Sequence, residues 1–372
     1  MIFLLAKFPN ENFPMKKVLC FIDSLGAGGA QRQMAGLAIA LKERGYDVTV
    51  VFYHEEMFFA ESLLSSGVSY VYLRKAERNL TRLLYVALFF RKMKPDVVVS
   101  YLDTPNICSC FSKFFNRSFK LVVSERNTTQ CTGKNEKIRF NMFRIADYIV
   151  PNAYAQGDYI KQTFPFLTQK IFIIPNFVNL HLFFPYYHQR SAIPEIIVVA
   201  TIWPSKNTMG FIDGIEALIK KNYKFHVNWY GKDLANIDYF NKCQRKIEEK
   251  GLSNYINLLE KTDKIDDCYR HADIFCLPSF YEGTPNVICE AMASGLPVLC
   301  SDVCDNSRYV SDGENGFLFN PNDANDIAKA IAKMIDIGDN DYMSFCKKSR
   351  MIAEEKLSKE RFINDYIKVI EQ

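Results

Sequence analysis

The chain has 372 residues, more than one typical hydrophobic core supports, so two domains are expected. Its hydrophobic fraction of 48% and charged fraction of 24% are usual for a globular protein. No apolar run approaches the roughly 20 residues of a membrane-spanning helix, and Leu83–Phe90 is far too short. These features are those of a globular protein and predict no membrane-spanning helix.

The formal charge of +4 hides an asymmetry between the two halves of the chain. Residues 1–190 hold 24 Lys and Arg against 14 Asp and Glu, whereas residues 191–372 hold 22 against 28. The first half is therefore basic and the second acidic. This division predicts that one half faces an anionic surface.

The 11 cysteines are scattered without paired spacing, and the five histidines show no ligand spacing. Neither pattern is typical of a zinc site, so no metal is expected. Most of the cysteines lie in apolar runs, which predicts small buried side chains in a reducing cytosol. Asp339-Asn340-Asp341 has a metal-binding Asp-x-Asp form, but its position between two expected terminal helices predicts a turn.

Residues 1–14 are expected to be a non-native or disordered extension. The apolar run Ile2–Ala6 is too short for a signal peptide, and Lys7 follows it rather than preceding it. We expect the natural start at Met15.

The first domain is expected to begin with a strand, Val18–Ile22, and a helix that ends near Arg44. Between them, Gly28 and Gly29 allow a close approach of the backbone to a ligand, although the glycine spacing is not that of a dinucleotide site. Further apolar runs with helical patterns between most of them predict a parallel, doubly wound sheet. These runs are 47–53, 68–73, 96–101, 119–124 and 148–151.

Two expected helices of this half, Leu80–Lys94 and Ile107–Lys120, combine apolar and basic residues. Such faces suit an anionic membrane surface, and either helix alone equally fits a core-facing helix with solvated charges. For the two helices together, the charge asymmetry between the halves favours the membrane-binding interpretation. The basic residues are Arg82, Arg91, Lys92, Lys94, Lys113, Arg117 and Lys120.

Polar residues follow two neighbouring strands of the first half. Asp103 and Asn106 follow one, and Arg126 and Asn127 follow the next. Open α/β sheets place functional residues at these carboxyl ends, so we expect these residues to belong to a site.

The second half opens with a strand, Glu195–Thr201, and a turn that contains Lys206, with a helix beginning near Asn207. A Lys at a strand-to-helix turn is well placed to bind phosphate. Strands are also expected at 224–230 and 255–258, the latter followed by Glu260 and Lys261.

The most informative segment is Ser279–Ser301, which follows a buried strand, Asp273–Leu277, and contains another, Pro297–Cys300. Thr284 is predicted as a helix N-cap with Pro285 at the first helical position, which leaves the amides of Asn286 and Val287 for a phosphate. Glu282 precedes this helix. Glu290 lies within it, where a carboxylate can accept hydrogen bonds from both ribose hydroxyls.

This motif, Tyr-Glu-Gly-x-Pro-Asn-Val-x-x-Glu-Ala-Met-Ala-x-Gly-x-Pro-Val, resembles the nucleotide-sugar site of retaining glycosyltransferases of family 4, which have the two-domain GT-B fold. Segments 173–179, 305–308 and 315–318 resemble the family's crossover and remaining turns. The resemblance covers residues 17–372 and implies an α/β fold of two Rossmann-like domains. These are expected at 15–185 and 186–355, with 356–372 as a helix that returns to the first domain.

The resemblance also implies roles for the site residues. The glycine loop at Gly28 and Gly29 faces the donor diphosphate, Lys206 and the amides of residues 284–287 stabilise it, and Glu282 with Gly283 orients the sugar. The backbone at Glu260 and Lys261 reads the base, and the acceptor side contains Asp103, Asn106, Arg126 and Asn127. The family's usual histidine near residue 103 is missing, as is its Arg, whose position is Ala200 or Thr201 here. Lys206 is therefore expected to act alone or with Arg126, the better-placed second catalytic cation.

The predicted function is metal-independent, retaining transfer of a sugar from a UDP- or GDP-linked donor, with no further cofactor. The expected acceptor is a lipid-linked or membrane-proximal glycan in cell-surface polysaccharide synthesis, reached from the cytoplasmic side with the basic domain on the membrane. No nucleic acid is expected as a partner. The alternatives are a nucleotide-sugar epimerase on the same fold and a non-catalytic, membrane-bound assembly protein.

Overall fold

The computed structural model describes residues 15–77, 79–127, 132–187, 189–232 and 234–372. The predicted extension 1–14 lies outside the described residues. The chain forms two compact units, which are taken in turn. Counting only described residues, the first comprises 15–77, 79–125 and 133–149, and the second comprises 126–127, 132, 150–187, 189–232 and 234–372.

The first sheet has six strands in the order β3-β2-β1-β4-β5-β6, and the pairs β1–β2, β1–β4, β2–β3 and β4–β5 are parallel. Its strands follow the predicted apolar runs because a parallel sheet covered on both faces buries nearly every residue. The strands are β1 (Lys17–Phe21), β2 (Asp47–Phe52), β3 (Ser69–Tyr72), β4 (Val97–Tyr101), β5 (Lys120–Glu125) and β6 (Tyr148–Pro151).

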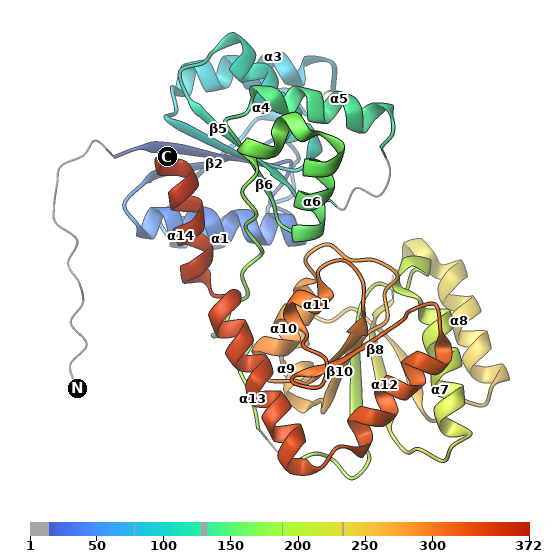
Figure 1. The fold of residues 1–372 in the computed structure, drawn as a ribbon. Coiled ribbons are helices and arrows are strands. Elements are labelled where there is room, and N and C mark those ends of the chain that lie inside the picture. Colours follow the sequence, from blue (N-terminus) through green and yellow to red (C-terminus); the bar gives the residue numbers. More distant parts are fainter. Residues whose placement is uncertain (1–14, 78, 128–131, 188, 233) are drawn as a thin grey trace, which may run out of the picture. The chain divides into compact units, whose positions relative to one another are not determined.

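Helices cover both faces of this sheet (Figure 1). They are α1 (Gly29–Glu43), α2 (Ala60–Ser65), α3 (Asn79–Met93), α4 (Asp103–Phe115) and α5 (Lys134–Met142), with short 3₁₀ turns η1 (Arg74–Ala76) and η2 (Phe143–Ile145). The helix α3 packs against α4.

Two of the basic residues proposed for a membrane face are buried, which corrects the sequence prediction. The Arg82 guanidinium lies 4.0 Å from the centre of the Tyr53 ring and donates to the carbonyls of Ala76 and Glu77. Lys113 donates to the Phe119 carbonyl at 2.6 Å and pairs with Asp147. Both cations bind groups inside the unit, so neither is available to a surface.

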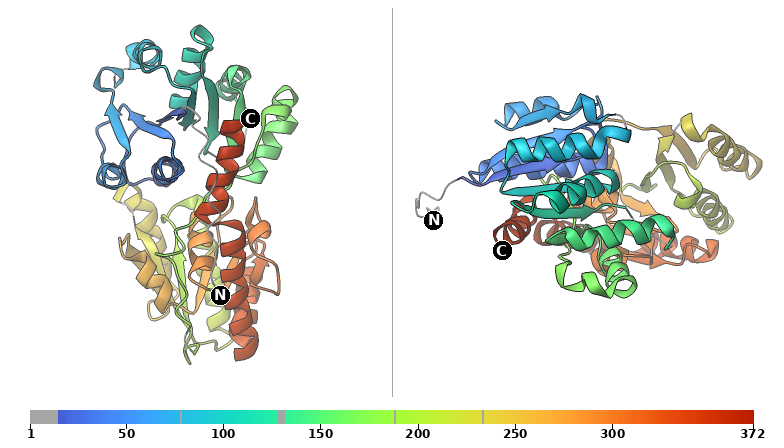
Figure 2. Two further views of the ribbon diagram at one scale, coloured as in Figure 1. Left: turned by 90° about the vertical axis from the view of Figure 1, so that its left-hand side faces the viewer. Right: turned by 90° about the horizontal axis from the view of Figure 1, so that it is seen from above.

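The second sheet also has six strands, in the order β12-β11-β10-β7-β8-β9, and its neighbours pair in parallel. Figure 2 shows helices on both of its faces. The strands are β7 (Glu195–Val199), β8 (His226–Lys232), β9 (Ile256–Glu260), β10 (Ile274–Leu277), β11 (Val298–Ser301) and β12 (Gly316–Phe319).

The remaining helices belong to this unit. They are α6 (Tyr154–Thr163), η3 (Pro165–Lys170), η4 (Pro204–Lys206), α7 (Thr208–Ile219), η5 (Leu234–Asn236), α8 (Ile237–Glu249), α9 (Ile265–His271), α10 (Asn286–Ala293), α11 (Asn306–Tyr309), α12 (Ala324–Asp336), α13 (Asp339–Lys356) and α14 (Lys359–Glu371).

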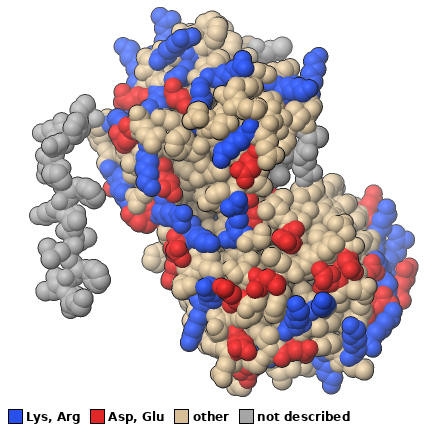
Figure 3. Space-filling view, in the orientation of Figure 1, with Lys and Arg blue, Asp and Glu red and all other residues tan. Residues whose placement is uncertain are grey.

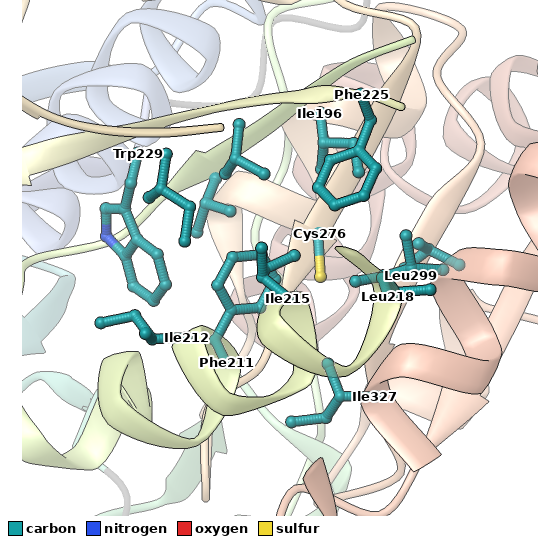
Figure 4. Close-up of a cluster of buried hydrophobic side chains, with 14 of the residues drawn as sticks. Ile196, Phe211, Ile212, Ile215, Leu218, Phe225, Trp229, Cys276, Leu299 and Ile327 are labelled. Atoms are coloured by element: carbon teal, nitrogen blue, oxygen red, sulfur yellow. The ribbon is translucent and has the colours of Figure 1, made fainter. Parts of the chain in front are cut away.

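Successive residues of each strand in the second sheet point to opposite faces. Ile196 and Val198 pack with α7, α8 and α12, whereas Ile197 packs with α9, α10 and α13. Figure 4 shows the first cluster, where Trp229 and Phe211 lie with ring centres 5.5 Å apart. Packing on both faces fixes the carboxyl ends of β7 and β10, which are adjacent strands.

Most predicted strands are confirmed within two residues at each end, and the doubly wound parallel architecture is confirmed. Three local predictions are wrong. The strand β12 forms where turns were expected at 315–318, α11 forms at the turn expected at 305–308, and Asp339-Asn340-Asp341 is the first turn of the 18-residue helix α13.

Candidate functional site

The segment between β10 and α10 forms the centre of the site. The helix α10 begins at Asn286 with Pro285 as its N-cap, no side chain caps it, and its first turn contains no acidic residue. The first amides of a helix lack intrahelical acceptors, and this end carries a partial positive charge. No carboxylate from the first turn of α10 therefore neutralises this positive helix end.

The predicted N-cap role of Thr284 is wrong. Its side chain is buried and its hydroxyl donates to the backbone carbonyl of Asn152, so the helix starts one residue later than expected. The predicted location of the positive helix end, at Asn286 and Val287, is unaffected by this shift.

Lys206 and Glu282 form an ion pair, with the Lys206 Nζ atom 2.6 Å from Glu282 Oε1. Lys206 ends η4 after β7, and Glu282 follows β10, so the neighbouring strands bring their loops together. The Phe280 amide donates to the Ser205 carbonyl at 2.9 Å and joins the two loops. The side chains are 26% and 11% exposed, so the pair is accessible from solvent.

Two residues beside Glu282 were not singled out from the sequence. The buried Ser279 hydroxyl donates to Glu282 Oε1 at 2.6 Å. The Glu282 amide lies beside the Cys304 thiol; burial raises the pKa of this thiol, and the amide opposes that rise. Both residues follow strands closely, at 279 after β10 and at 304 after β11, which is the signal that could have identified them.

Glu290 lies inside α10 and is 7% exposed. The hydroxyl of Tyr269, a fully buried residue of α9, lies 3.4 Å from Glu290 Oε2 and 3.4 Å from the Val287 carbonyl oxygen. Tyr269 was missed in the sequence analysis. It lies in a helix of only seven residues, and such a short pattern does not indicate which face of the helix packs against α10.

Arg126 is connected to the first residue of α10 through Asn176. Its Nη1 donates to Asn176 Oδ1 at 2.5 Å, and its Nη2 donates to the Tyr366 hydroxyl at 2.9 Å. Asn176 Nδ2 then donates to Asn286 Oδ1 at 2.8 Å. All four residues belong to the second unit. A second cation is thus linked to the positive helix end.

Other candidates of the second unit lie at strand ends. Glu260 ends β9 and has a 79% exposed side chain, 3.5 Å from Lys232 Nζ. Lys261 and Asn127 are exposed, and Gly283 is half-buried in the loop before α10. Their predicted contacts with base, acceptor and sugar stay predictions.

The candidates of the first unit differ in accessibility. Gly28 is the N-cap of α1 and Gly29 its first residue, in ordinary extended and helical backbone. Asp103 begins α4 and pairs with Arg139, which also lies 3.6 Å from Glu125. Asn106 is fully buried and joins Ser100 of β4 to the Ser124 carbonyl of β5. Because its amide is enclosed, Asn106 is removed from the candidate acceptor residues.

The arrangement in the second unit suits a diphosphate ester. A positive helix end, Lys206 and the linked Arg126 offer positive charge, and Glu282 and Glu290 offer acceptors for hydroxyl groups. Among the residues that the structure describes, no group of three or more His, Cys, Asp or Glu is placed to hold a metal ion. Within the same residues, no helix combines the length and apolarity needed to cross a membrane.

Comparison with known families gives two matches that together span most of the chain. Residues 27–182 match the family "Glycosyltransferase Family 4", and residues 193–336 match "Glycosyl transferases group 1". The first falls mainly on the first unit, and the second contains Lys206, Glu282 and Glu290.

Two curated bacterial relatives are similar in sequence. A UDP-Gal:alpha-D-GlcNAc-diphosphoundecaprenol alpha-1,3-galactosyltransferase of Escherichia coli is 27% identical over 181 residues, which are 45% of this chain and only 46% of that protein. The chain thus spans about half the length of this relative. A Campylobacter jejuni alpha-1,4-N-acetyl-D-galactosaminyltransferase, whose name gives an undecaprenol-linked glycan, is 22% identical over 362 residues, 94% and 92% of the two chains.

Among solved structures, HepE of Anabaena in complex with UDP and glucose superposes with a TM-score of 0.81 at 19% identity, covering 96% of this chain and 99% of that one. A likeness at this identity establishes the fold. Together with the two family matches and the bacterial relatives, it identifies the chain as a member of the GT-B glycosyltransferases related to glycosyltransferase family 4.

Proposed function

We propose that the protein transfers a sugar, with retention of anomeric configuration and without a metal, from a UDP- or GDP-linked donor to a glycan hydroxyl. The observation that carries this proposal is the uncapped N-terminus of α10 beside the Lys206–Glu282 pair. A helix end and a Lys together favour the negative charge that builds on a departing diphosphate.

The proposed step needs no nucleophile from the protein. The acceptor hydroxyl oxygen bonds to the anomeric carbon as the bond from that carbon to the diphosphate breaks on the same face. The acceptor proton passes to the departing phosphate oxygen. Lys206, the amides of Asn286 and Val287, and Arg126 through its link to Asn286 stabilise the leaving group, while Glu282 orients the sugar and Glu290 holds the ribose.

Two experiments test this proposal. A thermal-shift screen of nucleoside diphosphates should raise the Tm with UDP or GDP, because a ligand at 100 times its Kd stabilises a protein by about 2.7 kcal/mol. Product analysis with the donor alone then separates the rivals: an epimerase converts the sugar, a transferase requires an acceptor, and an assembly protein leaves the donor intact. Binding of neither nucleotide would contradict the proposal.

We further propose that the acceptor is lipid-linked and that the first unit docks on the anionic cytoplasmic leaflet. The two bacterial relatives carry undecaprenol in their names, which supports this acceptor class. On α3, Leu84 and Leu88 are exposed by 58% and 53% one turn apart, and Phe114 and Phe115 are exposed at the end of α4. Figure 3 shows Lys and Arg side chains over the outer helices of this unit, at the top of the view.

With Arg82 and Lys113 buried, four exposed cations accompany these apolar side chains, namely Arg91, Lys92, Lys94 and Arg117. Each is worth about 1 kcal/mol near an anionic surface, enough for reversible attachment. Sedimentation with anionic liposomes should show binding that falls with salt and that Leu84→Ser with Leu88→Ser abolishes. Met351→Ser, at an exposed methionine of α13, is the control. Binding that is equally strong to anionic and to zwitterionic liposomes would contradict the membrane proposal and leave the proposed sugar transfer unaffected.

A further inference from the structure

Ser279 occupies a buried position directly behind the candidate donor site. It follows the end of β10 by two residues, and none of its surface is exposed. Its hydroxyl donates to Glu282 Oε1 at 2.6 Å, a short bond of the kind that hydroxyls make to ionised carboxylates. Because the hydroxyl is enclosed, it holds the carboxylate without the freedom of a surface side chain.

The same oxygen of Glu282 also accepts from Lys206 Nζ at 2.6 Å. Two donors from different loops therefore meet at Oε1, and neither of these bonds involves Oε2. An ammonium group has three donors, so Lys206 keeps two for other acceptors while it is bound to Glu282. The carboxylate is thus fixed at one oxygen by a buried hydroxyl on one side and a half-exposed cation on the other.

We infer that Ser279 is a positioning residue, which sets the orientation of the Glu282 carboxylate and through it the place of Lys206. Oε1 holds the ammonium against the donor diphosphate, and Oε2 is left to accept a hydrogen bond from a hydroxyl of the donor sugar. This inference rests on the proposed function. It assigns to a buried serine the task of fixing the leaving group and the sugar relative to each other, which is where small displacements cost most turnover.

The loops themselves favour this assignment. The backbone bond from Phe280 to Ser205 fixes the loop of Ser279 and Glu282 against the loop of Lys206. With both loop backbones joined, the remaining freedom lies in the torsions of the two long side chains. A single buried hydroxyl three residues before Glu282 removes that freedom at the carboxylate.

The test compares three variants with the wild type. Ser279→Ala removes the hydroxyl, and Ser279→Thr retains it. Ser301→Ala is the matched control. Ser301 ends the adjacent strand β11 and is equally buried, and its hydroxyl donates over a long 3.5 Å to the Leu277 carbonyl. For each protein, the Tm, the Kd for UDP and for GDP by calorimetry, and the turnover of the nucleotide sugar are measured.

We expect Ser279→Ala to lower turnover about tenfold or more, the loss typical of one hydrogen bond to a charged group. The Kd for the nucleoside diphosphate should stay within about threefold, since this ligand lacks the sugar that Glu282 orients. Ser279→Thr should recover turnover, and Ser301→Ala should behave as the wild type.

Several results would overturn the inference. Wild-type turnover in Ser279→Ala would show that the hydroxyl is dispensable. Equal losses in Ser279→Ala and Ser301→Ala, or a fall in turnover matched by the fall in diphosphate affinity, would show loosened packing rather than positioning. If Ser279→Thr does not fold, the comparison of the two alanine variants decides alone. If the wild type binds neither UDP nor GDP, both the proposed function and this inference are overturned. If the wild type transfers the sugar and Ser279→Ala has the same turnover, only the inference is overturned.

Discussion

Glu282 and Glu290, the two carboxylates of one loop-and-helix segment, lie in different surroundings although both are largely shielded from solvent. Glu282 has an 11% exposed side chain in a loop, where it binds the ammonium of Lys206 and the hydroxyl of Ser279. Glu290 lies within α10, with the neutral hydroxyl of the buried Tyr269 at a longer 3.4 Å. One carboxylate thus has a short, charged contact at the edge of the protein, and the other has a long, neutral contact inside it.

This difference indicates which end of the segment governs which property. An ion pair at an accessible edge can redistribute its hydrogen bonds when a diphosphate arrives, so its effect is largest when charge builds on the leaving group. A carboxylate enclosed in a helix keeps its place, so in the ribose-binding role proposed for Glu290 its effect is on affinity. We therefore expect the Lys206 end to control turnover and the Glu290 end to control affinity.

The largest expected effect is that of Lys206→Ala on turnover. Removing one preorganised electrostatic donor typically lowers kcat by about 10². Affinity for the donor should fall less, because the amides of α10 still bind the diphosphate. Steady-state kinetics with the nucleotide sugar measures both.

Lys250→Ala is the matched control for Lys206→Ala. Lys250 is 27% exposed and is also paired with a carboxylate, that of Glu216 in α7, but it lies at the C-terminal end of α8 rather than in a loop beside α10. Turnover within about threefold of the wild type in Lys206→Ala would transfer the role to Arg126 or to the helix amides.

Next in size is the effect of Glu290→Gln on affinity. The variant keeps the shape of the side chain but loses its charge, so nucleotide binding should weaken by about 1.5–3 kcal/mol, the range for hydrogen bonds to a charged group. Calorimetry with the nucleoside diphosphate gives this value directly. Glu195→Gln, at a half-buried carboxylate at the start of β7, should leave it unchanged. Equal affinities of the wild type and Glu290→Gln would remove Glu290 from the ribose site.

Sequence patterns predicted the strands well because parallel sheets covered on both faces leave long apolar runs. Sequence patterns failed where the apolar run is short or is interrupted by polar and charged residues. The strand β12 pairs at the sheet edge over four residues, two of which are half-buried, and the helix α13 has charged residues along most of its length. Arg82 and Lys113 were expected to face a membrane and are buried instead. The sequence pattern thus does not reveal which basic side chain turns inward.

The ion pair between Lys206 and Glu282 illustrates the same limit at the candidate site. Both residues were placed after strands by their patterns, but 76 residues separate them. Only the strand order, with β10 directly beside β7, brings their loops together. Tyr269 was missed for the same reason, because it belongs to α9 and meets Glu290 of α10 only in the folded chain. Ser279 lies only three residues before Glu282 and was missed because a loop sequence does not show which side chains turn toward each other.

A smaller effect, and one of opposite sign, is expected for Glu282→Gln. Neutralising the carboxylate leaves the charge of Lys206 free to attract the diphosphate, so the nucleoside diphosphate should bind up to about fivefold more tightly, since a partly exposed ion pair is worth up to about 1 kcal/mol. Turnover should fall at the same time because Lys206 and the sugar lose their fixed position. Weaker diphosphate binding, measured by calorimetry, would contradict this prediction. It would show that the hold of Oε1 on Lys206, inferred above, matters more for the diphosphate alone than the charge that Glu282 neutralises.

The smallest expected effect is that of Tyr269→Phe on affinity. The hydroxyl of Tyr269 lies 3.4 Å from both Glu290 Oε2 and the Val287 carbonyl, longer than a typical hydrogen bond, so its loss should cost about 0.5 kcal/mol, or about twofold in the Kd of the nucleoside diphosphate. Tyr342→Phe is the control. Tyr342, a residue of α13, is also buried, and its hydroxyl donates to the Asp273 carbonyl at 3.0 Å. Removing that hydroxyl should lower the Tm without changing the Kd. A loss of tenfold or more in Tyr269→Phe would mean that Tyr269 orients Glu290 for the ribose, and the buried end of the segment would then be positioned as strictly as the exposed end is by Ser279.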